Sequence, residues 1–171
     1  MKRWLAALPL IALAALGALF ALYALNRNPH VEPQALVGKP VPALTLPDLD
    51  GGVARPLRAA LGDGPALVNF YASWCAPCEV EQPALVALKA SGVRIIGVAY
   101  KDAPQNAQAF LDRLGDPFAA RLVDRDGRGG IEFGVTGVPE TFAVRADGVI
   151  AAKHSGPMSL SQAQALLAKA R

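Results

Sequence analysis

The strongest constraint on the fold comes from the two cysteines, Cys75 and Cys78, which are the only ones in the chain. An apolar run over residues 66–71 precedes them, and apolar residues at helical spacing follow them up to Gly92. These patterns predict a buried strand and then a helix, with Pro77 in the first helical turn, where a missing N–H costs little. Their spacing lets the two sulfurs reach bonding distance, and the positive end of the helix favours a thiolate at Cys75.

Two other uses of this cysteine pair are a plain stabilising disulfide and a structural zinc site. A loop this short restricts the unfolded chain little, so the pair is poorly placed as a staple. A structural zinc site needs four ligands, and the chain adds only His30 and His154, one in a polar segment and one in a distant predicted strand. We therefore expect a redox-active dithiol, with no metal and no cofactor.

Strands and helices alternate through the middle of the chain, as in an α/β unit with a parallel sheet. A hairpin is predicted near the start of the domain, where residues 43–46 lead into the turn-forming residues 48–52. Pro83 is expected to kink the helix after the cysteines. The other predicted elements are a strand over 93–99, a helix over 106–114, strands over 139–144 and 149–153 joined by a tight turn, and a last helix over 159–170 capped by Ser159 or Ser161.

The first 25 residues form an apolar segment in which Lys2 and Arg3 precede an uncharged run from Trp4 to Leu25. At ~1.5 Å per residue, a helix of this length spans the ~30 Å hydrocarbon layer of a membrane. A cleaved signal peptide is the alternative, but its apolar part is usually only ~7–15 residues long. We expect a membrane anchor over 1–25 with a cytoplasmic N-terminus, a tether over 26–37 and an exported domain over 38–171.

The net charge of +3 excludes little by itself, because 17 basic residues face 14 acidic ones. Without Lys2 and Arg3, the exported part has 15 basic residues against 14. No basic run that would neutralise several phosphates is present, so we expect no nucleic-acid partner.

Two blocks of sequence resemble a known family. Trp74-Cys75-Ala76-Pro77-Cys78, with Pro83 five residues on, resembles the thioredoxin superfamily. The segment Gly134-Val135-Thr136-Gly137-Val138-Pro139-Glu140-Thr141-Phe142, together with Tyr100-Lys101-Asp102, is similar to the membrane-anchored thiol:disulfide interchange proteins of cytochrome c maturation, the DsbE or CcmG type. The resemblance covers residues 38–158 and implies a thioredoxin-like α/β fold, with a central mixed β-sheet flanked by helices, an N-terminal β-hairpin extension and an N-terminal transmembrane helix.

The resemblance also implies roles for individual residues. Cys75 attacks a partner's disulfide and Cys78 resolves the mixed disulfide. Pro139 is a cis-proline that faces the cysteines and leaves the Val138 backbone free to pair with an extended substrate, the alternative being a trans proline that opens a strand. Trp74 shields the sulfurs and packs against a partner, unless it is a core aromatic.

Glu81 and Glu140 are candidates for raising a thiol pKa or for relaying a proton, since Glu81 follows Cys78 by three residues and Glu140 follows Pro139 directly. Both are alternatively solvated surface charges. A thioredoxin has a buried aspartate six residues before the first cysteine, whereas this chain has Asn69. The usual proton acceptor is therefore missing, which leaves the two glutamates as its substitutes.

These expectations predict a periplasmic thiol:disulfide oxidoreductase on the bacterial inner membrane. It would reduce apocytochrome c, or a haem-ligation partner, and would receive electrons from a membrane carrier of the DsbD type. One alternative is a general periplasmic reductant or oxidant without cytochrome specialisation. A second is a module that binds apocytochrome and in which the cysteines are incidental.

Overall fold

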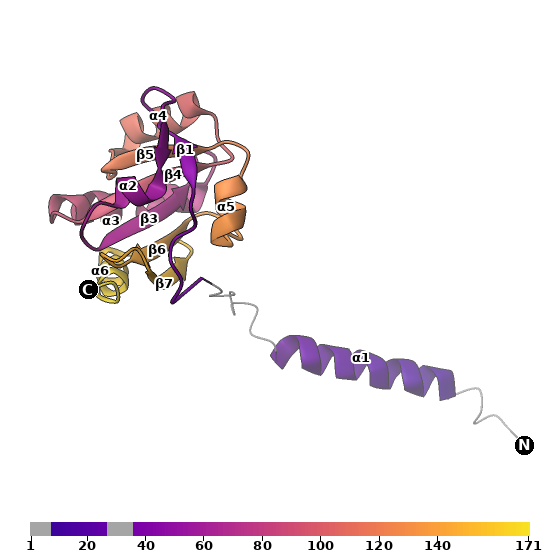
Figure 1. Ribbon diagram of the computed structural model, residues 1–171. Coiled ribbons are helices and arrows are strands. Elements are labelled where there is room, and N and C mark those ends of the chain that lie inside the picture. Colours follow the sequence, from indigo (N-terminus) through magenta and orange to yellow (C-terminus); the bar gives the residue numbers. More distant parts are fainter. Residues whose placement is uncertain (1–7, 27–35) are drawn as a thin grey trace, which may run out of the picture. The chain divides into compact units, whose positions relative to one another are not determined.

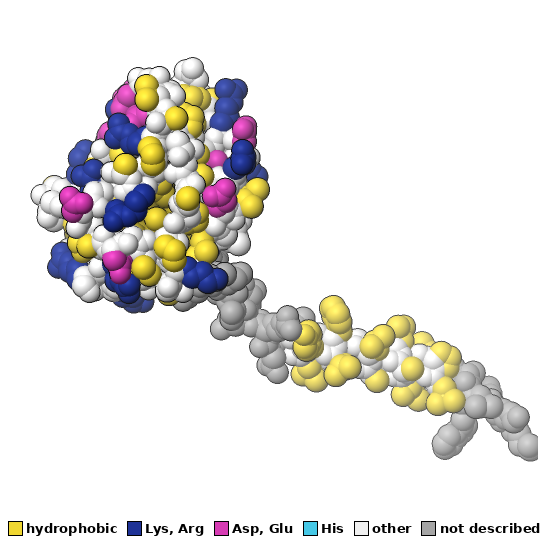
Figure 2. Space-filling view, viewed as in Figure 1, with side chains coloured by type: hydrophobic (Ala, Val, Ile, Leu, Met, Phe, Trp, Pro, Cys, Tyr) yellow, Lys and Arg dark blue, Asp and Glu magenta, His cyan; other side chains and the backbone are white. Residues whose placement is uncertain are grey.

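The computed structural model describes residues 8–26 and 36–171, which form two units. The first contains helix α1 (Leu8–Asn26), on which hydrophobic side chains are exposed along the described turns (Figure 2). Among the described residues, no helix combines the length and apolar character that crossing a membrane requires. The transmembrane helix predicted within residues 1–25 is thus not confirmed; its first seven residues, and most of the predicted tether, lie outside the described residues.

The second unit is built on a five-stranded mixed sheet in the order β5-β4-β3-β6-β7 (Figure 1). The central strand β3 pairs in parallel with β4, and β4 with β5, while β6 pairs antiparallel with both β3 and β7. The strand bounds are β3 (Ala66–Tyr71), β4 (Arg94–Tyr100), β5 (Ala120–Asp124), β6 (Glu140–Val144) and β7 (Ile150–Ser155).

Helices cover both faces of this sheet, because successive side chains of each strand alternate between the faces. On one face, Leu67 and Tyr71 of β3 share a core with α3 (Ala76–Ala90), α4 (Pro104–Leu114) and α6 (Leu160–Ala168). On the other face, Val68 and Phe70 pack with α2 (Leu57–Leu61) and α5 (Arg128–Phe133). We call these the α3 face and the α5 face.

A short antiparallel hairpin of β1 (Thr45–Pro47) and β2 (Ala54–Pro56) precedes the sheet. Leu44 and Leu46 bury their side chains in the core of the α5 face. The backbone of Asp48 bridges to Leu122 of β5, so the hairpin covers part of that edge strand. The predicted hairpin is confirmed.

The predicted elements between residues 66 and 170 are confirmed, with shifts of a few residues at their ends. The helix expected from residue 106 begins at Pro104, since a proline is tolerated in the first turn, and Ser159 is the cap of α6. Three elements were not predicted: α2, β5 and α5. Helix α3 continues through Pro83 without interruption.

Candidate active site

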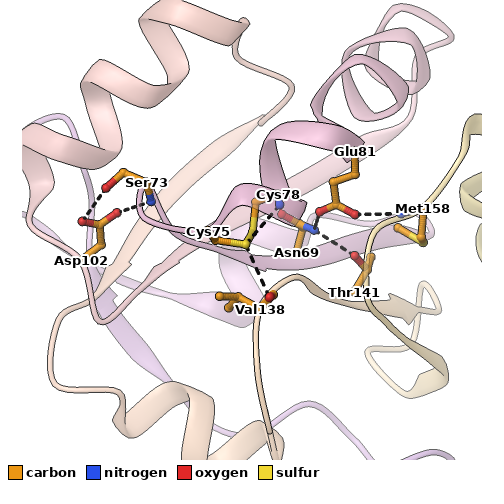
Figure 3. Close-up of a disulfide and its surroundings, with 9 residues drawn as sticks. All are labelled: Asn69, Ser73, Cys75, Cys78, Glu81, Asp102, Val138, Thr141 and Met158. Carbon is orange, nitrogen blue, oxygen red and sulfur yellow. Dashed lines mark hydrogen bonds between the residues drawn. A yellow bond between two sulfur atoms is a disulfide. The ribbon is translucent and has the colours of Figure 1, made fainter. Parts of the chain in front are cut away.

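The disulfide between Cys75 and Cys78 lies where β3 gives way to α3 (Figure 3). Cys75 is the N-cap residue of α3, and its Sγ accepts the backbone N–H of Cys78 at 3.1 Å. Free N–H groups at a helix start stabilise negative charge, so the same contact is suited to hold a thiolate at Cys75 after reduction. Both cysteines are buried in the core of the α3 face.

A buried carboxylate holds the corner that leads into Cys75. Asp102, two residues after the end of β4, accepts the N–H of Ser73 at 2.6 Å and its hydroxyl at 3.0 Å. The indole N–H of Trp74 donates to the carbonyl oxygen of Lys101 at 3.2 Å. Trp74 is nevertheless 59% exposed, which rules out a core aromatic.

The loop before β6 lies against the same sulfur. The Val138–Pro139 peptide bond is cis, as predicted. The carbonyl oxygen of Val138 lies 3.5 Å from Cys75 Sγ, so the loop backbone and the first cysteine meet at one point (Figure 3). A polypeptide that paired with the Val138 backbone would therefore lie next to this sulfur.

A polar network lies within the α3 face, on the Cys78 side of the disulfide in Figure 3. Asn69 of β3 donates from Nδ2 to Glu81 Oε1 at 2.8 Å and to Thr141 Oγ1 at 2.9 Å. The second carboxylate oxygen of Glu81 accepts the backbone N–H of Met158 at 3.3 Å. Glu81 is only 1% exposed, so the alternative of a solvated surface charge is wrong for this residue.

Burial raises the pKa of Glu81 from 4.5 to about 7, against the opposing effect of the bonds from Asn69 and Met158. A carboxyl group with a pKa near neutral both takes up and releases a proton at physiological pH. Glu81 follows Cys78 by one helical turn, which places the two side chains on the same side of α3. Glu81 is therefore a candidate for the proton acceptor that Asn69 does not provide.

Glu140 is buried as well, but on the other face of the sheet. Thr141 lies on the α3 face with Asn69, whereas Phe142, two residues from Glu140 in β6, belongs to the core of the α5 face. Glu140 Oε1 accepts bonds from Thr136 and Ser155, and Oε2 forms an ion pair with Lys153. A solvated surface charge is thus wrong here too, and a proton-relay role for Glu140 stays a prediction.

The sequence assigned no contact to Asp102, which holds Ser73, or to Lys153, which pairs with Glu140. A signal for Asp102 was present: it follows the strand next to β3, and the carboxyl ends of parallel strands meet at one edge of a sheet. No such signal exists for Lys153, whose partner is fixed by strand register. Within residues 8–26 and 36–171, no three His, Cys, Asp or Glu side chains gather as metal ligands would; His30 lies outside these ranges.

The sequence was compared with those of known proteins and protein families. Residues 36–167 match the Redoxin family. The chain is 44% identical over 160 residues to the thiol:disulfide interchange protein HelX of Rhodobacter capsulatus, covering 93% of this chain and 90% of HelX. It is 41% identical over 126 residues to the thiol:disulfide interchange protein DsbE of Escherichia coli K12, covering 73% of this chain and 68% of DsbE.

Structural comparison agrees. The fold matches that of a secreted Mycobacterium tuberculosis disulfide oxidoreductase homologous to DsbE of Escherichia coli, with a TM-score of 0.65 and 26% identity. That match covers 74% of this chain and 95% of the other. The thioredoxin-like α/β fold with its mixed sheet is therefore confirmed.

Proposed function

The chain belongs to the Redoxin family and is a thiol:disulfide interchange protein, and from this premise we propose that it reduces the paired cysteines of apocytochrome c, or of a haem-ligation partner, before haem is attached. The observation that carries the proposal is the Cys75–Cys78 pair at the start of α3, with the Val138 carbonyl 3.5 Å from Cys75 Sγ. The block from Gly134 to Phe142, which resembles the DsbE type, supports the choice of substrate.

In the proposed reaction, the Cys75 thiolate attacks one sulfur of the partner's disulfide. A Cys75–partner bond forms, the partner's disulfide breaks, and its other sulfur leaves as a thiolate that takes up a proton. The Cys78 thiol then loses its proton and attacks Cys75 Sγ, which breaks the mixed disulfide and releases the second partner sulfur as a thiolate that also takes up a proton. The partner gains two electrons and two protons, and the chain ends with the Cys75–Cys78 disulfide.

Glu81 is the group we assign to the Cys78 proton. The attack of Cys78 on the mixed disulfide requires a thiolate. Glu81 lies one helical turn from Cys78 and is buried, whereas Glu79, the other acid of α3, is exposed. Its pKa of about 7 matches the task, because a base near the working pH accepts a proton and gives it up again. Trp74, which is exposed beside the disulfide, is assigned to packing against the partner.

We further propose that the domain works on the periplasmic side of the bacterial inner membrane, tethered by the N-terminal segment. The support is the position of Lys2 and Arg3 before an uncharged run that extends to Leu25. The dithiol is recharged by a membrane electron donor of the DsbD type. Retention in the membrane fraction after a carbonate wash, with the domain cleaved by protease added to spheroplasts, is the expected result. Release by the wash, or protection from protease, would contradict this location.

A Cys78→Ser variant tests the substrate assignment, because it cannot resolve the mixed disulfide that Cys75 forms. Expressed in cells that make c-type cytochromes, it should accumulate a disulfide-linked adduct with apocytochrome c or a haem-ligation partner. The Cys75→Ser, Cys78→Ser double variant is the matched control and should trap nothing. Adducts spread over unrelated exported proteins would favour a general reductant, and cytochrome yield at the wild-type level in the double variant would favour a binding module.

A further inference from the structure

Glu140 and Lys153 form a charged pair that is almost fully shielded from water. Lys153 Nζ lies 2.9 Å from Glu140 Oε2, and the two side chains are 4% and 2% exposed, respectively. The ammonium group also lies 5.5 Å from the centre of the Phe142 ring. Removing two charges from water is costly, so a buried pair is a poor source of stability and is better suited to fixing one arrangement of its neighbours.

The pair is separated from the disulfide by the sheet. Glu140 and Lys153 lie with Phe142 on the α5 face, whereas the cysteines belong to the core of the α3 face. Asn69 and Glu81 form the polar network on the cysteine side. Glu140 therefore lies across the sheet from Asn69 and Glu81.

Both members of the pair instead hold the loop that ends at Pro139. Glu140 Oε1 accepts the hydroxyl of Thr136 at 2.8 Å and its backbone N–H at 3.3 Å. Lys153 Nζ donates to the carbonyl oxygen of Gly134 at 3.1 Å. The loop is thus bonded at Gly134 and at Thr136 before its backbone reaches Val138. Thr136 and Gly137 are themselves exposed.

We infer that Glu140 and Lys153 form a buried clamp that positions the 134–139 loop, so that the Val138 backbone is held ready to pair with an extended polypeptide substrate at Cys75. Glu140 is a positioning residue in this inference, which rests on the proposed function. The clamp matters for a substrate that pairs with the Val138 backbone. It does not matter for a small dithiol, which reaches the disulfide without that pairing.

Two rates measured on the full chain separate these cases. The first is reduction, by the reduced chain, of an oxidised peptide that carries a Cys-x-x-Cys-His disulfide; an oxidised Cys-x-x-Cys peptide of unrelated sequence is run in parallel. The second is reduction of the Cys75–Cys78 disulfide by dithiothreitol. In the Glu140→Met, Lys153→Met double variant, which leaves no buried charge unpaired, the ratio of peptide rate to dithiothreitol rate should fall roughly ten- to a hundred-fold.

The Glu140→Gln variant provides the conservative comparison, since its amide oxygen can still accept the Thr136 hydroxyl. It should lower the rate ratio by a smaller factor than the double methionine variant does. If the double methionine variant does not fold, the Glu140→Gln result alone tests the clamp. The matched control is Glu79→Met, Arg113→Met, which removes an exposed ion pair between α3 and α4 and should leave the ratio unchanged.

A ratio that stays at the wild-type value in Glu140→Gln and in the folded double variant would overturn the clamp. Equal losses in the peptide and dithiothreitol rates would overturn it too, because they would place the effect on the cysteines themselves. Failure of the proposed function would give a different result, because the wild-type chain would then reduce the unrelated peptide but not the Cys-x-x-Cys-His peptide. The rate ratio measured on the unrelated peptide would still test the clamp.

Discussion

The raised pKa of Glu81 makes the stability of the folded chain fall as the pH rises, opposite to the effect of an ordinary salt-bridged carboxylate. The group titrates at 4.5 in the unfolded chain and at about 7 in the folded one, because burial penalises its charged form. Between these values the folded chain keeps a proton that the unfolded chain has released, so the free energy of unfolding decreases as the pH increases. At ~1.4 kcal/mol per pKa unit, the whole decrease is about 3 kcal/mol.

A Glu81→Gln variant removes this titration while keeping a side chain of the same shape. Urea unfolding of the oxidised full chain, followed by circular dichroism from pH 4 to pH 8, measures the difference between wild type and variant. With the disulfide intact, the cysteines do not titrate. The free energy of unfolding of the wild type, relative to the variant, should fall by about 3 kcal/mol through this range and level off at both ends.

Glu79 in the same helix supplies the control. Its pKa is lowered by the hydrogen bond from Arg113, so a Glu79→Gln variant should show a difference of the opposite sign. Stability curves for wild type and Glu81→Gln that run parallel between pH 4.5 and pH 7 would refute the assignment of a buried, protonated carboxyl group to Glu81.

Three further substitutions test the corner before Cys75, the packing of α5 and the cap of α6, each by urea unfolding at neutral pH. Asp102→Ala should cost about 1–3 kcal/mol, because it leaves the N–H of Ser73 without its partner. Gly130→Ala should cost about 1–3 kcal/mol, since an added Cβ would clash with the Tyr100 ring. Ser159→Ala should cost about 1 kcal/mol through loss of the capping box of α6.

Gly51→Ala is the control for these substitutions, because its added Cβ would meet nothing within 4 Å. It should stay within about 0.5 kcal/mol of the wild type. Wild-type stability of the Asp102 variant would show that the corner before Cys75 does not need its carboxylate. Wild-type stability of the Gly130 or Ser159 variant would contradict the close packing of α5 or the capping of α6.

The sequence predicts the central elements well because local patterns determine them. Residues 66–71 are apolar except for Asn69 and follow Pro65, which is typical of a strand buried on both sides, and β3 has these bounds. The cysteine pair could be placed at a helix start for the same reason. The face on which Asn69 lies also follows from the alternation of side chains along a strand, since Leu67 and Tyr71, two residues before and after it, lie on the α3 face.

Helix α5 was missed because its sequence disfavours a helix and its support comes from elsewhere in the chain. It contains Gly129 and Gly130, which are poor helix formers. Their N–H groups donate to the carboxylate of Asp124, and Tyr100 occupies the space of a side chain at position 130. None of these contacts is local enough to be read from periodicity.

The buried ion pair between Glu140 and Lys153 could not be predicted from the sequence either, because it depends on contacts between distant segments. The partner of Glu140, Lys153, is set by the pairing of β6 with β7, which contains a register shift at Ala143 and Val144. A one-residue change in register would turn the lysine to the other face of the sheet. The alternating pattern of a strand therefore identifies the strand but not the face on which a single charge lies.

The most direct test of the account is the order in which the two cysteines react after reduction. Limiting iodoacetamide at pH 7, followed by mass spectrometry of the full chain, should label Cys75 ahead of Cys78, because Cys75 Sγ faces the N–H groups at the start of α3. Labelling of Cys78 first, or of both cysteines at the same rate, would contradict the assignment of Cys75 as the attacking sulfur.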